Sequence, residues 1–143
     1  MAGEQDRRIP YFCFESIMKK NLVIVPTFNE AENIEELVPV VMGLERPFDM
    51  LVVDDNSPDG TGRIIDQLCA NDIRTHVLHR SVKSGIGSAH LDGIRWAYKR
   101  GYDTLITMDC DFAHSPAHIP AFIENAANAD LVVGTRFVLC DSL

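Results

Sequence analysis

Two aspartates separated by one residue are the first candidates for chemistry in this sequence. Asp109 and Asp111 follow an apolar run at residues 104–108, which we expect to be a strand. In an extended segment, side chains two residues apart point the same way, so both carboxylates could bind one hard divalent ion such as Mg²⁺ or Mn²⁺. Such an ion would neutralise charge on a diphosphate leaving group. The alternative is that both acids are solvated loop residues or cap the next helix, because the D-x-D pattern is common by chance.

Polar residues also follow two other apolar runs. Asp54 and Asp55 come directly after one of them and could accept hydrogen bonds from a ribose or a base, although the Asn-Ser-Pro-Asp-Gly that follows is also a plain turn and helix start. Arg80 and Lys83 precede two glycines and could bring cations and free backbone N–H groups to phosphates at a helix N-terminus. Solvated basic residues are the alternative for this second segment.

Short apolar runs alternate with segments of helical period, which is typical of a mostly parallel sheet covered by helices. We expect strands at residues 22–25, 50–53, 75–78, 104–108 and 131–133. We expect four helices, marked in turn by Ile34, Leu37, Val38 and Val41, by Ile64, Ile65 and Leu68, by Leu91, Ile94 and Tyr98, and by Ile119, Phe122, Ile123 and Ala126. Asn29 with Glu32 resembles a capping box before the first helix. Ligands bind beyond the carboxyl ends of such strands, where the polar residues gather.

The chain length of 143 residues suits one domain. Residues 1–17 show no clean period, so we interpret them as an N-terminal extension and residues 18–143 as the folded domain, beginning near Met18. Four widely separated cysteines without a C-x-x-C pair argue against a zinc site or a disulfide framework and favour the reducing cytoplasm. No apolar run approaches the ~18 residues of a membrane span, so we expect any membrane contact to be peripheral.

The charge balance argues against one class of partner. Acidic residues number 21 and basic residues 13, which gives a formal charge of −8. A surface of this sign repels polyphosphate backbones unless the basic residues cluster on one face. We therefore expect no nucleic-acid partner.

Several segments together resemble family 2 glycosyltransferases with a GT-A fold, in particular polyprenyl-phosphate mannosyltransferases of the dolichol-phosphate mannose synthase type. The matching segments are residues 25–34 (VPTFNEAENI), 52–61 (VVDDNSPDGT), 83–89 (KSGIGSA) and 108–111 (MDCD), followed by 134–137 (GTRF), which is similar to the family's Gly-Ser-Arg-Tyr segment. The ordered set covers roughly residues 21–138 and is far more specific than any single motif.

The resemblance implies a site for a nucleotide-sugar donor. The residues that would line the nucleotide pocket or contact the donor are Pro26, Phe28, Glu30, Val53, Asp55, Lys83, Met108, Asp109, Cys110 and Arg136. Asp109 and Asp111 would hold the metal, and Arg136 would face the donor phosphates or the sugar.

This sequence also departs from the family's pattern. Phe28 replaces the commoner Tyr and so lacks a hydroxyl, and Ala113 stands where relatives often carry Gln or Ser that can assist the metal. We therefore expect a lower metal affinity. The family continues with an acceptor-binding segment beyond the point where this sequence stops, so we expect a truncated GT-A domain without that half.

The resemblance implies that mannose moves from GDP-mannose to a polyprenyl (dolichyl) phosphate at the cytosolic membrane face, with inversion at the anomeric carbon. The second pKa of a phosphate monoester is about 6, so the acceptor is already an ionised nucleophile and needs no general base. Asp111 and Arg136 would be the catalytic residues, acting with the divalent cation and Lys83 through positioning and electrostatic stabilisation.

Three other functions remain open at this point. One is a family 2 transferase with another donor, such as UDP-glucose, because fold and D-x-D are shared across those activities. Another is a noncatalytic nucleotide-sugar-binding fragment, completed or not by a partner chain or a homo-oligomer. A third is a phosphoacceptor receiver, which fits poorly because its acidic pair follows the first strand, whereas Asp54 and Asp55 follow the second.

Overall fold

Strands and helices alternate along the chain, as the apolar runs predict. The computed structural model describes residues 19–45 and 47–134, so the expected extension at residues 1–17 and a start at Met18 lie outside the described residues. The elements are β1 (Asn21–Thr27), α1 (Ala31–Met42), β2 (Asp49–Asp54), α2 (Thr61–Asn71), β3 (Thr75–His79), α3 (Ile86–Lys99), β4 (Thr104–Thr107), the 3₁₀ helix η1 (Pro116–His118) and α4 (Ile119–Asn125).

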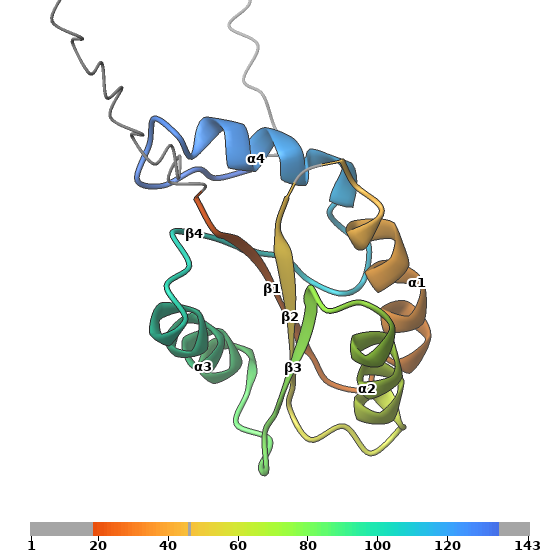
Figure 1. The fold of residues 1–143 in the computed structure, drawn as a ribbon. Helices are drawn as coiled ribbons and strands as arrows, with labels where there is room; N and C mark the ends of the chain where they lie inside the picture. Colours follow the sequence, from red (N-terminus) through yellow and green to blue (C-terminus); the bar gives the residue numbers. More distant parts are fainter. Residues whose placement is uncertain (1–18, 46, 135–143) are drawn as a thin grey trace, which may run out of the picture.

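The four strands form one parallel sheet in the order β3-β2-β1-β4 (Figure 1). The chain steps outward from β1 to β2 and β3, then crosses back to place β4 on the other side of β1. Right-handed crossovers put α1 and α2 on one face of the sheet and α3 on the opposite face. The mostly parallel α/β architecture expected from the sequence is therefore confirmed.

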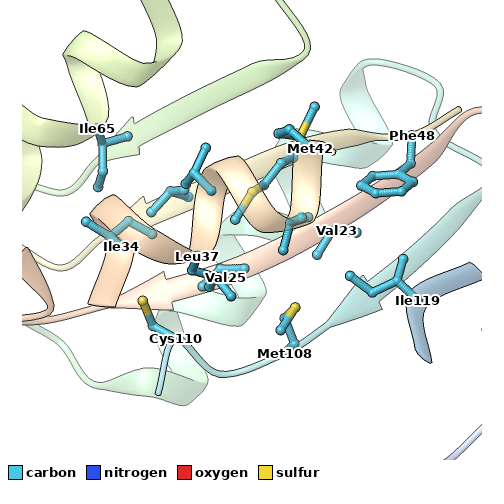
Figure 2. Close-up of a cluster of buried hydrophobic side chains, with 14 residues drawn as sticks. Val23, Val25, Ile34, Leu37, Met42, Phe48, Ile65, Met108, Cys110 and Ile119 are labelled. Atoms are coloured by element: carbon cyan, nitrogen blue, oxygen red, sulfur yellow. The ribbon is translucent and has the colours of Figure 1, made fainter. Parts of the chain in front are cut away.

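The larger core cluster lies between the sheet and the helices α1, α2 and α4 (Figure 2). All four residues that mark the first expected helix are buried here: Ile34, Leu37, Val38 and Val41. Each such side chain stabilises the fold by roughly 1.5–3 kcal/mol relative to full exposure. Met108 and Cys110, which follow β4, point into the same cluster.

The smaller core cluster lies beneath α3 and differs from the prediction. Leu91, Ile94 and Tyr98, which mark this helix in the sequence, are exposed by 54%, 40% and 84%. The buried residues of α3 are instead Ala89, Gly93 and Ala97. A Cβ atom built on Gly93 would lie 2.8 Å from Ile24 Cγ2 and 3.3 Å from Val53 Cγ2. Small residues are therefore required here because the helix backbone lies close to β1 and β2, and apolar periodicity alone identified the wrong face.

The fifth expected strand, residues 131–133, is wrong. No residue from 131 to 134 belongs to a strand, and Leu131 and Val133 are exposed by 80% and 75%. β4 pairs with β1 and forms the edge of the sheet within the described residues. A strand needs a hydrogen-bonded partner, which three apolar residues in a row do not guarantee.

None of the helices within residues 19–45 and 47–134 combines the length and the apolar character needed to cross a membrane.

Candidate functional site

The strand order puts the position where open parallel sheets form a ligand-binding crevice at the carboxyl ends of β1 and β4. After β1 the chain continues to β2 on one side of β1, and it later returns to place β4 on the other side. The direction in which strands are added therefore reverses between β1 and β4. Open parallel sheets bind ligands where the strand order reverses in this way. The segment from Phe28 onward follows β1 and the segment from Met108 onward follows β4, so both border this crevice.

The turn between β1 and α1 is held by side chains of the loop between β2 and α2. Asn29 adopts a left-handed backbone conformation with φ of 56°, and Glu30 is the N-cap residue without a side-chain cap. Three backbone amides donate to the neighbouring loop: Asn29 to Ser57 Oγ (3.0 Å), Glu30 to Thr61 Oγ1 (3.0 Å) and Ala31 to Asp59 Oδ2 (3.2 Å). The capping box expected from Asn29 and Glu32 is therefore wrong, because oxygens distant in sequence satisfy these amides.

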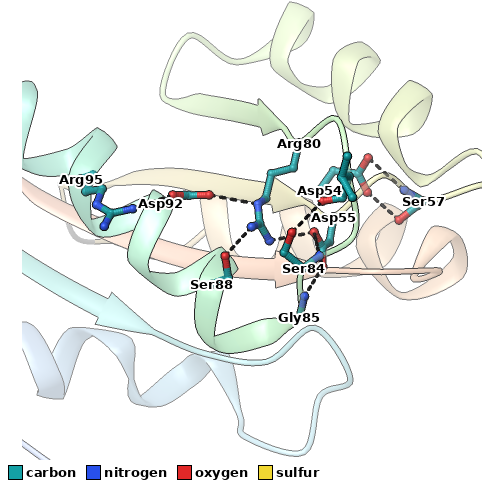
Figure 3. A network of polar contacts seen from close by, with 10 residues as sticks. Asp54, Asp55, Ser57, Arg80, Ser84, Gly85, Ser88, Asp92 and Arg95 are labelled. Carbon is teal, nitrogen blue, oxygen red and sulfur yellow. Dashed lines mark hydrogen bonds and ion pairs between the residues drawn. The ribbon is translucent and has the colours of Figure 1, made fainter.

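Asp55, the first residue after β2, is the acceptor for three donors of the loop before α3 (Figure 3). Its Oδ1 accepts a hydrogen bond from Arg80 Nη1 at 2.7 Å, and the backbone amides of Ser84 and Gly85 donate to its carboxylate at 3.2 and 3.0 Å. The side chain is only 5% exposed. Since a carboxylate offers about four lone-pair positions, one remains for a further donor.

Arg80 lies at the centre of this network and not on the surface (Figure 3). Besides Asp55 it contacts Ser88 Oγ at 2.5 Å through Nη2 and Asp92 Oδ2 at 3.1 Å through Nε. Arg80 and the amides of Ser84 and Gly85 thus already have partners within the protein. The sequence hypothesis that this loop meets phosphates stays a prediction.

Asp54 is likewise an internal acceptor. Ser57 Oγ donates to its Oδ1 at 2.5 Å, and His79 Nδ1 lies 3.8 Å from its Oδ2. Asp54 is 4% exposed. The turn interpretation made from the sequence describes this residue, which organises the loop between β2 and α2.

Lys83 is placed differently from Arg80. Its Nζ lies 3.5 Å from the centroid of the Phe28 ring, so a cation from the loop before α3 contacts an aromatic face at the end of β1. Cation–π contact of this kind is worth about 0.5–1 kcal/mol at an exposed site. An exposed cation and an aromatic ring are thus brought together at one edge of the sheet.

Asp109 and Asp111 follow β4 and are both exposed, whereas the intervening Cys110 is 3% exposed and lies in the core. Burial raises the pKa of the Cys110 thiol to about 12, with the nearby charges of Glu30 and Asp111 contributing. Glu30 follows β1, so the carboxylates that follow β1 and β4 converge. The alternation of exposure agrees with the expectation that Asp109 and Asp111 point away from the core together.

A divalent ion can be tested against this donor set. Residues 19–45 and 47–134 contain no group of three or more His, Cys, Asp and Glu side chains suited to a metal. Mg²⁺ is usually held by only one or two carboxylates together with water and substrate phosphates. The amide of Ala113 donates to Asp111 Oδ1 at 2.9 Å, which orients this carboxylate. Two exposed carboxylates, one of them oriented by a backbone amide, are a donor set that fits a hard ion shared with a diphosphate.

An open cavity of about 760 Å³ runs from Met108 and Asp109 along β4. Its walls come from β4, α3 and α4, and they include His90, His114 and His118. The volume lies within the range of small-molecule sites. Asp109 therefore borders both the crevice between β1 and β4 and a space large enough for part of a ligand.

Other predicted site residues lie near this edge with less accessible side chains. Pro26 and Val53 are paired in adjacent strands, and both are buried. Met108 and Cys110 are buried in the core, so contact with a ligand would involve their backbone atoms. The half-buried Glu30 accepts a hydrogen bond from Asn33 Nδ2 at 2.6 Å. The contacts of these residues with a nucleotide remain predictions.

Arg136 and most of the segment 134–137 lie outside the described residues. Its predicted role is therefore carried forward as a prediction only.

Sequence reasoning did not identify the residues whose side chains fix the loops of the site through hydrogen bonds and ion pairs. Ser88 and Asp92 are four residues apart on α3 and both contact Arg80, and Thr61 caps the start of α1 from another helix. The spacing of Ser88 and Asp92 places them on one face of a helix. That both contact Arg80 could not be predicted, because this contact depends on how β3 and α3 pack together.

Comparison with known proteins gives a family for this arrangement. The profile for glycosyl transferase family 2 matches residues 22–142. The undecaprenyl-phosphate mannosyltransferase of Micrococcus luteus is 46% identical over 121 residues, which cover 82% of this chain and 48% of that protein. The polyprenol monophosphomannose synthase of Mycolicibacterium smegmatis is 43% identical over 122 residues, 84% of this chain and 46% of that protein. The chain thus spans about half the length of these curated relatives.

Solved structures agree in fold. Mannosyltransferase PcManGT from Pyrobaculum calidifontis, in complex with GDP-Man and Mn²⁺, superposes with a TM-score of 0.56 at 25% identity, over 64% of this chain and 27% of that chain. TarS 1–349 of S. aureus, in complex with UDP, gives a TM-score of 0.59 at 28% identity, over 73% and 32%. The parallel sheet flanked by helices is the GT-A arrangement expected from the sequence. With a profile match over most of its length, this chain belongs to glycosyl transferase family 2.

Proposed function

We propose that this chain carries the donor-binding part of a polyprenyl-phosphate mannosyltransferase, which moves mannose from GDP-mannose to a polyprenyl phosphate with inversion. The observation that carries the proposal is the 46% and 43% identity, over more than four fifths of this chain, to two proteins named for this chemistry. The complex of a structural neighbour with GDP-Man supports the same donor.

The geometry supports a donor site at the crevice between β1 and β4. Phe28 offers a ring face to the nucleotide and Lys83, 3.5 Å from that ring, offers a positive charge to its phosphates. Pro26 and Val53, which are paired in β1 and β2, and Asp55, which follows β2, would line the nucleotide pocket behind them. Glu30, which follows β1, and Met108 and Cys110, which follow β4, would contribute further contacts, and Arg136 would face the phosphates or the sugar.

A divalent cation belongs to the proposed site. Asp109 and Asp111 are the residues that would hold it, and a structural neighbour of this chain was solved with Mn²⁺. When bound, the ion would supply Lewis-acid stabilisation of the diphosphate leaving group. The ion would be Mg²⁺ or Mn²⁺, both of which are hard ions that oxygen ligands bind.

The chain's own residues then bind and orient the donor. A polyprenyl phosphate is largely ionised near pH 7, because its second pKa is about 6, so it attacks the anomeric carbon without a general base. One bond forms to the acceptor oxygen as the bond to the nucleoside diphosphate breaks on the opposite face. Lys83 and Arg136 stabilise the charge that develops on the leaving diphosphate. A polyprenyl phosphate is a membrane lipid, so the protein has to reach it at a membrane surface. We therefore propose that the protein associates peripherally with the cytosolic face.

A UDP-sugar donor is the second candidate. The specific observation in its favour is the match to TarS in complex with UDP, with a TM-score of 0.59 and 28% identity. The stronger sequence identity to the polyprenyl-phosphate enzymes favours GDP-mannose. A direct comparison of the two donors separates the candidates.

The test is calorimetric titration of the full chain with GDP-mannose and with UDP-glucose, each with and without Mn²⁺. We expect metal-dependent binding that prefers GDP-mannose, and its loss in Asp111→Asn, which keeps an oxygen for the amide of Ala113. The exposed Glu35 on α1 provides a matched carboxylate-to-amide control, Glu35→Gln, which should bind as the wild type does. Preference for UDP-glucose would favour the second candidate, and binding of neither donor would contradict both.

A further inference from the structure

We propose that Arg80 is a positioning residue of the donor site, which holds the loop before α3 so that Lys83 meets the donor phosphates. The inference rests on the proposed function, because it assumes that Lys83 and Phe28 face a nucleotide. It assigns Arg80 no contact with the donor.

The first argument is that all three nitrogens of the Arg80 guanidinium group contact other residues of the protein. Nη1 contacts Asp55 at 2.7 Å, Nη2 contacts Ser88 at 2.5 Å and Nε contacts Asp92 at 3.1 Å, so each nitrogen already has a protein partner. The side chain is 9% exposed. The second N–H groups of Nη1 and Nη2 belong to a side chain that is almost fully buried, so a phosphate has little access to them.

The second argument is charge. Arg80 carries one positive charge between two carboxylates, those of Asp55 and Asp92. The cluster as a whole is therefore not positive, and it offers little attraction to a diphosphate. Within residues 19–45 and 47–134, no carboxylate pairs with Lys83, which lies on an aromatic ring, so its charge is available to an anion.

The third argument is how the loop is fixed. The backbone amide of Arg80 donates to the carbonyl of Asp54 at 2.9 Å, which ties the start of the loop to the end of β2. The amides of Ser84 and Gly85 donate to Asp55, which connects the end of the loop to the first residue after β2. Lys83 lies in the loop between the residues that make these hydrogen bonds.

Arg80 determines the geometry of the hydrogen bonds from Ser84 and Gly85 to Asp55. Its Nη1 holds Asp55 Oδ1, and its other nitrogens hold Ser88 and Asp92 on α3, so one side chain connects β2 to the first two turns of α3 (Figure 3). Because hydrogen bonds to charged groups are the stronger ones, loss of the guanidinium frees Asp55 and with it the amides of Ser84 and Gly85. The position of Lys83 over Phe28 is then lost.

Amide hydrogen exchange of the nucleotide-free full chain tests the positioning directly. We expect exchange at Ser84 and Gly85 to become about tenfold faster in Arg80→Gln, because a hydrogen bond to a charged group is lost. The matched control is Arg95→Gln, which also removes an arginine paired with Asp92, at 3.2 Å, but one that is 70% exposed. It should leave both amides unchanged. Unchanged exchange in Arg80→Gln would overturn the proposal.

A double-mutant cycle separates positioning from direct contact. We expect Arg80→Gln and Lys83→Met each to weaken GDP-mannose binding about tenfold, and the double variant to bind no worse than Lys83→Met alone. A residue that itself contacts the donor would instead give losses that multiply to about a hundredfold, which would overturn the proposal. If Arg80→Gln does not fold, Ser88→Ala removes a single partner of Arg80 and should produce smaller changes of the same kind.

The two proposals fail separately. A wild-type chain that binds no nucleotide would contradict the proposed function, whereas the exchange rates of Ser84 and Gly85 would still decide whether Arg80 fixes the loop. If the wild-type chain binds GDP-mannose and the losses of binding free energy in Arg80→Gln and Lys83→Met add up in the double variant, the proposed function stands and the positioning role of Arg80 is overturned.

Discussion

The ammonium of Lys83 lies 3.5 Å from the centroid of the Phe28 ring, which joins two loops that are 55 residues apart in the chain. Phe28 follows β1 and Lys83 precedes α3, so the contact spans the carboxyl edge of the sheet. A charge and an aromatic face at one place are a suitable pair for a ligand with both phosphates and a base. The same contact costs little to break, because an exposed cation–π pair is worth only about 0.5–1 kcal/mol.

We expect Lys83→Met to separate binding from stability. The variant should bind GDP-mannose about tenfold more weakly, because a charged partner of the phosphates is lost. The free energy of unfolding should change by less than about 1 kcal/mol, since Lys83 is exposed. Calorimetry and urea unfolding measure the two quantities. Lys99→Met, at an exposed lysine near the far end of α3, is the control and should change neither; equal losses of affinity in both variants would contradict a specific role.

Gly93 should tolerate no side chain. A Cβ atom there would lie 2.8 Å from Ile24 Cγ2, so Gly93→Ala forces an overpacked contact that typically costs about 1–3 kcal/mol. Gly87 on the same helix has nothing within 4 Å of a built Cβ, so Gly87→Ala should stabilise the chain by about 0.4–1 kcal/mol. Urea unfolding of both variants gives the comparison. The packing account fails if Gly93→Ala is as stable as the wild type.

The contrast between α1 and α3 indicates what sequence periodicity can predict. α1 buries the residues that its apolar spacing marks, such as Leu37, because its large side chains fill the space above the sheet. α3 lies so close to the sheet that its fully buried positions hold only small residues, whereas Ile94 and the other large apolar residues that mark the helix in the sequence are exposed. Apolar spacing predicted that both helices exist, but the distance between a helix and the sheet is a tertiary property.

The candidate site likewise contains residues that the sequence predicts and residues that depend on the assembled fold. Asp109, Asp111 and Lys83 were predicted because each follows or precedes an element whose end could be read from the sequence. The role of Arg80 could not be predicted, since its partners Asp55 and Asp92 lie 25 and 12 residues away and meet it only once β2, β3 and α3 are assembled. A basic residue in a glycine-rich loop looks the same in sequence whether it binds a ligand or holds the loop.

Tyr102 should affect stability without affecting the donor site. Its hydroxyl donates to Asp49 Oδ2 at 2.5 Å. Asp49 begins β2 and Tyr102 precedes β4, so the pair lies at the amino-terminal edge of the sheet, opposite the carboxyl edge. Burial, followed by the hydrogen bond to Asp49, raises the pKa of Tyr102 well above its ordinary value. We expect Tyr102→Phe to lower the free energy of unfolding by about 1–3 kcal/mol, with unchanged GDP-mannose binding. Urea unfolding and calorimetry test both parts, and a loss of affinity would contradict the separation.

Asp59 should make stability depend on pH at the acidic end. Burial raises the pKa of its carboxyl, but hydrogen bonds from the hydroxyl and amide of Thr61 and from the amide of Ala31 lower it, and the net pKa lies below the ordinary 3.8. A group whose pKa is lowered by folding stabilises the fold above its unfolded pKa and loses this effect as pH falls through the folded value. The stabilisation is therefore fully present well above pH 3.8 and is lost progressively as pH falls through the lowered folded pKa.

We expect Asp59→Ala to be about 1 kcal/mol less stable than the wild type at pH 6, the typical cost of removing a side-chain oxygen from a helix start. The difference should shrink as pH falls below 3.8, because the wild-type carboxyl becomes protonated and loses its advantage. Urea unfolding between pH 3 and pH 6 measures this trend. Asp59→Asn, which retains an oxygen but does not titrate, should differ from Asp59→Ala by a constant amount. A wild-type advantage over Asp59→Ala that stays constant down to pH 3 would show that the charge of Asp59 contributes nothing to holding α1 and α2 together.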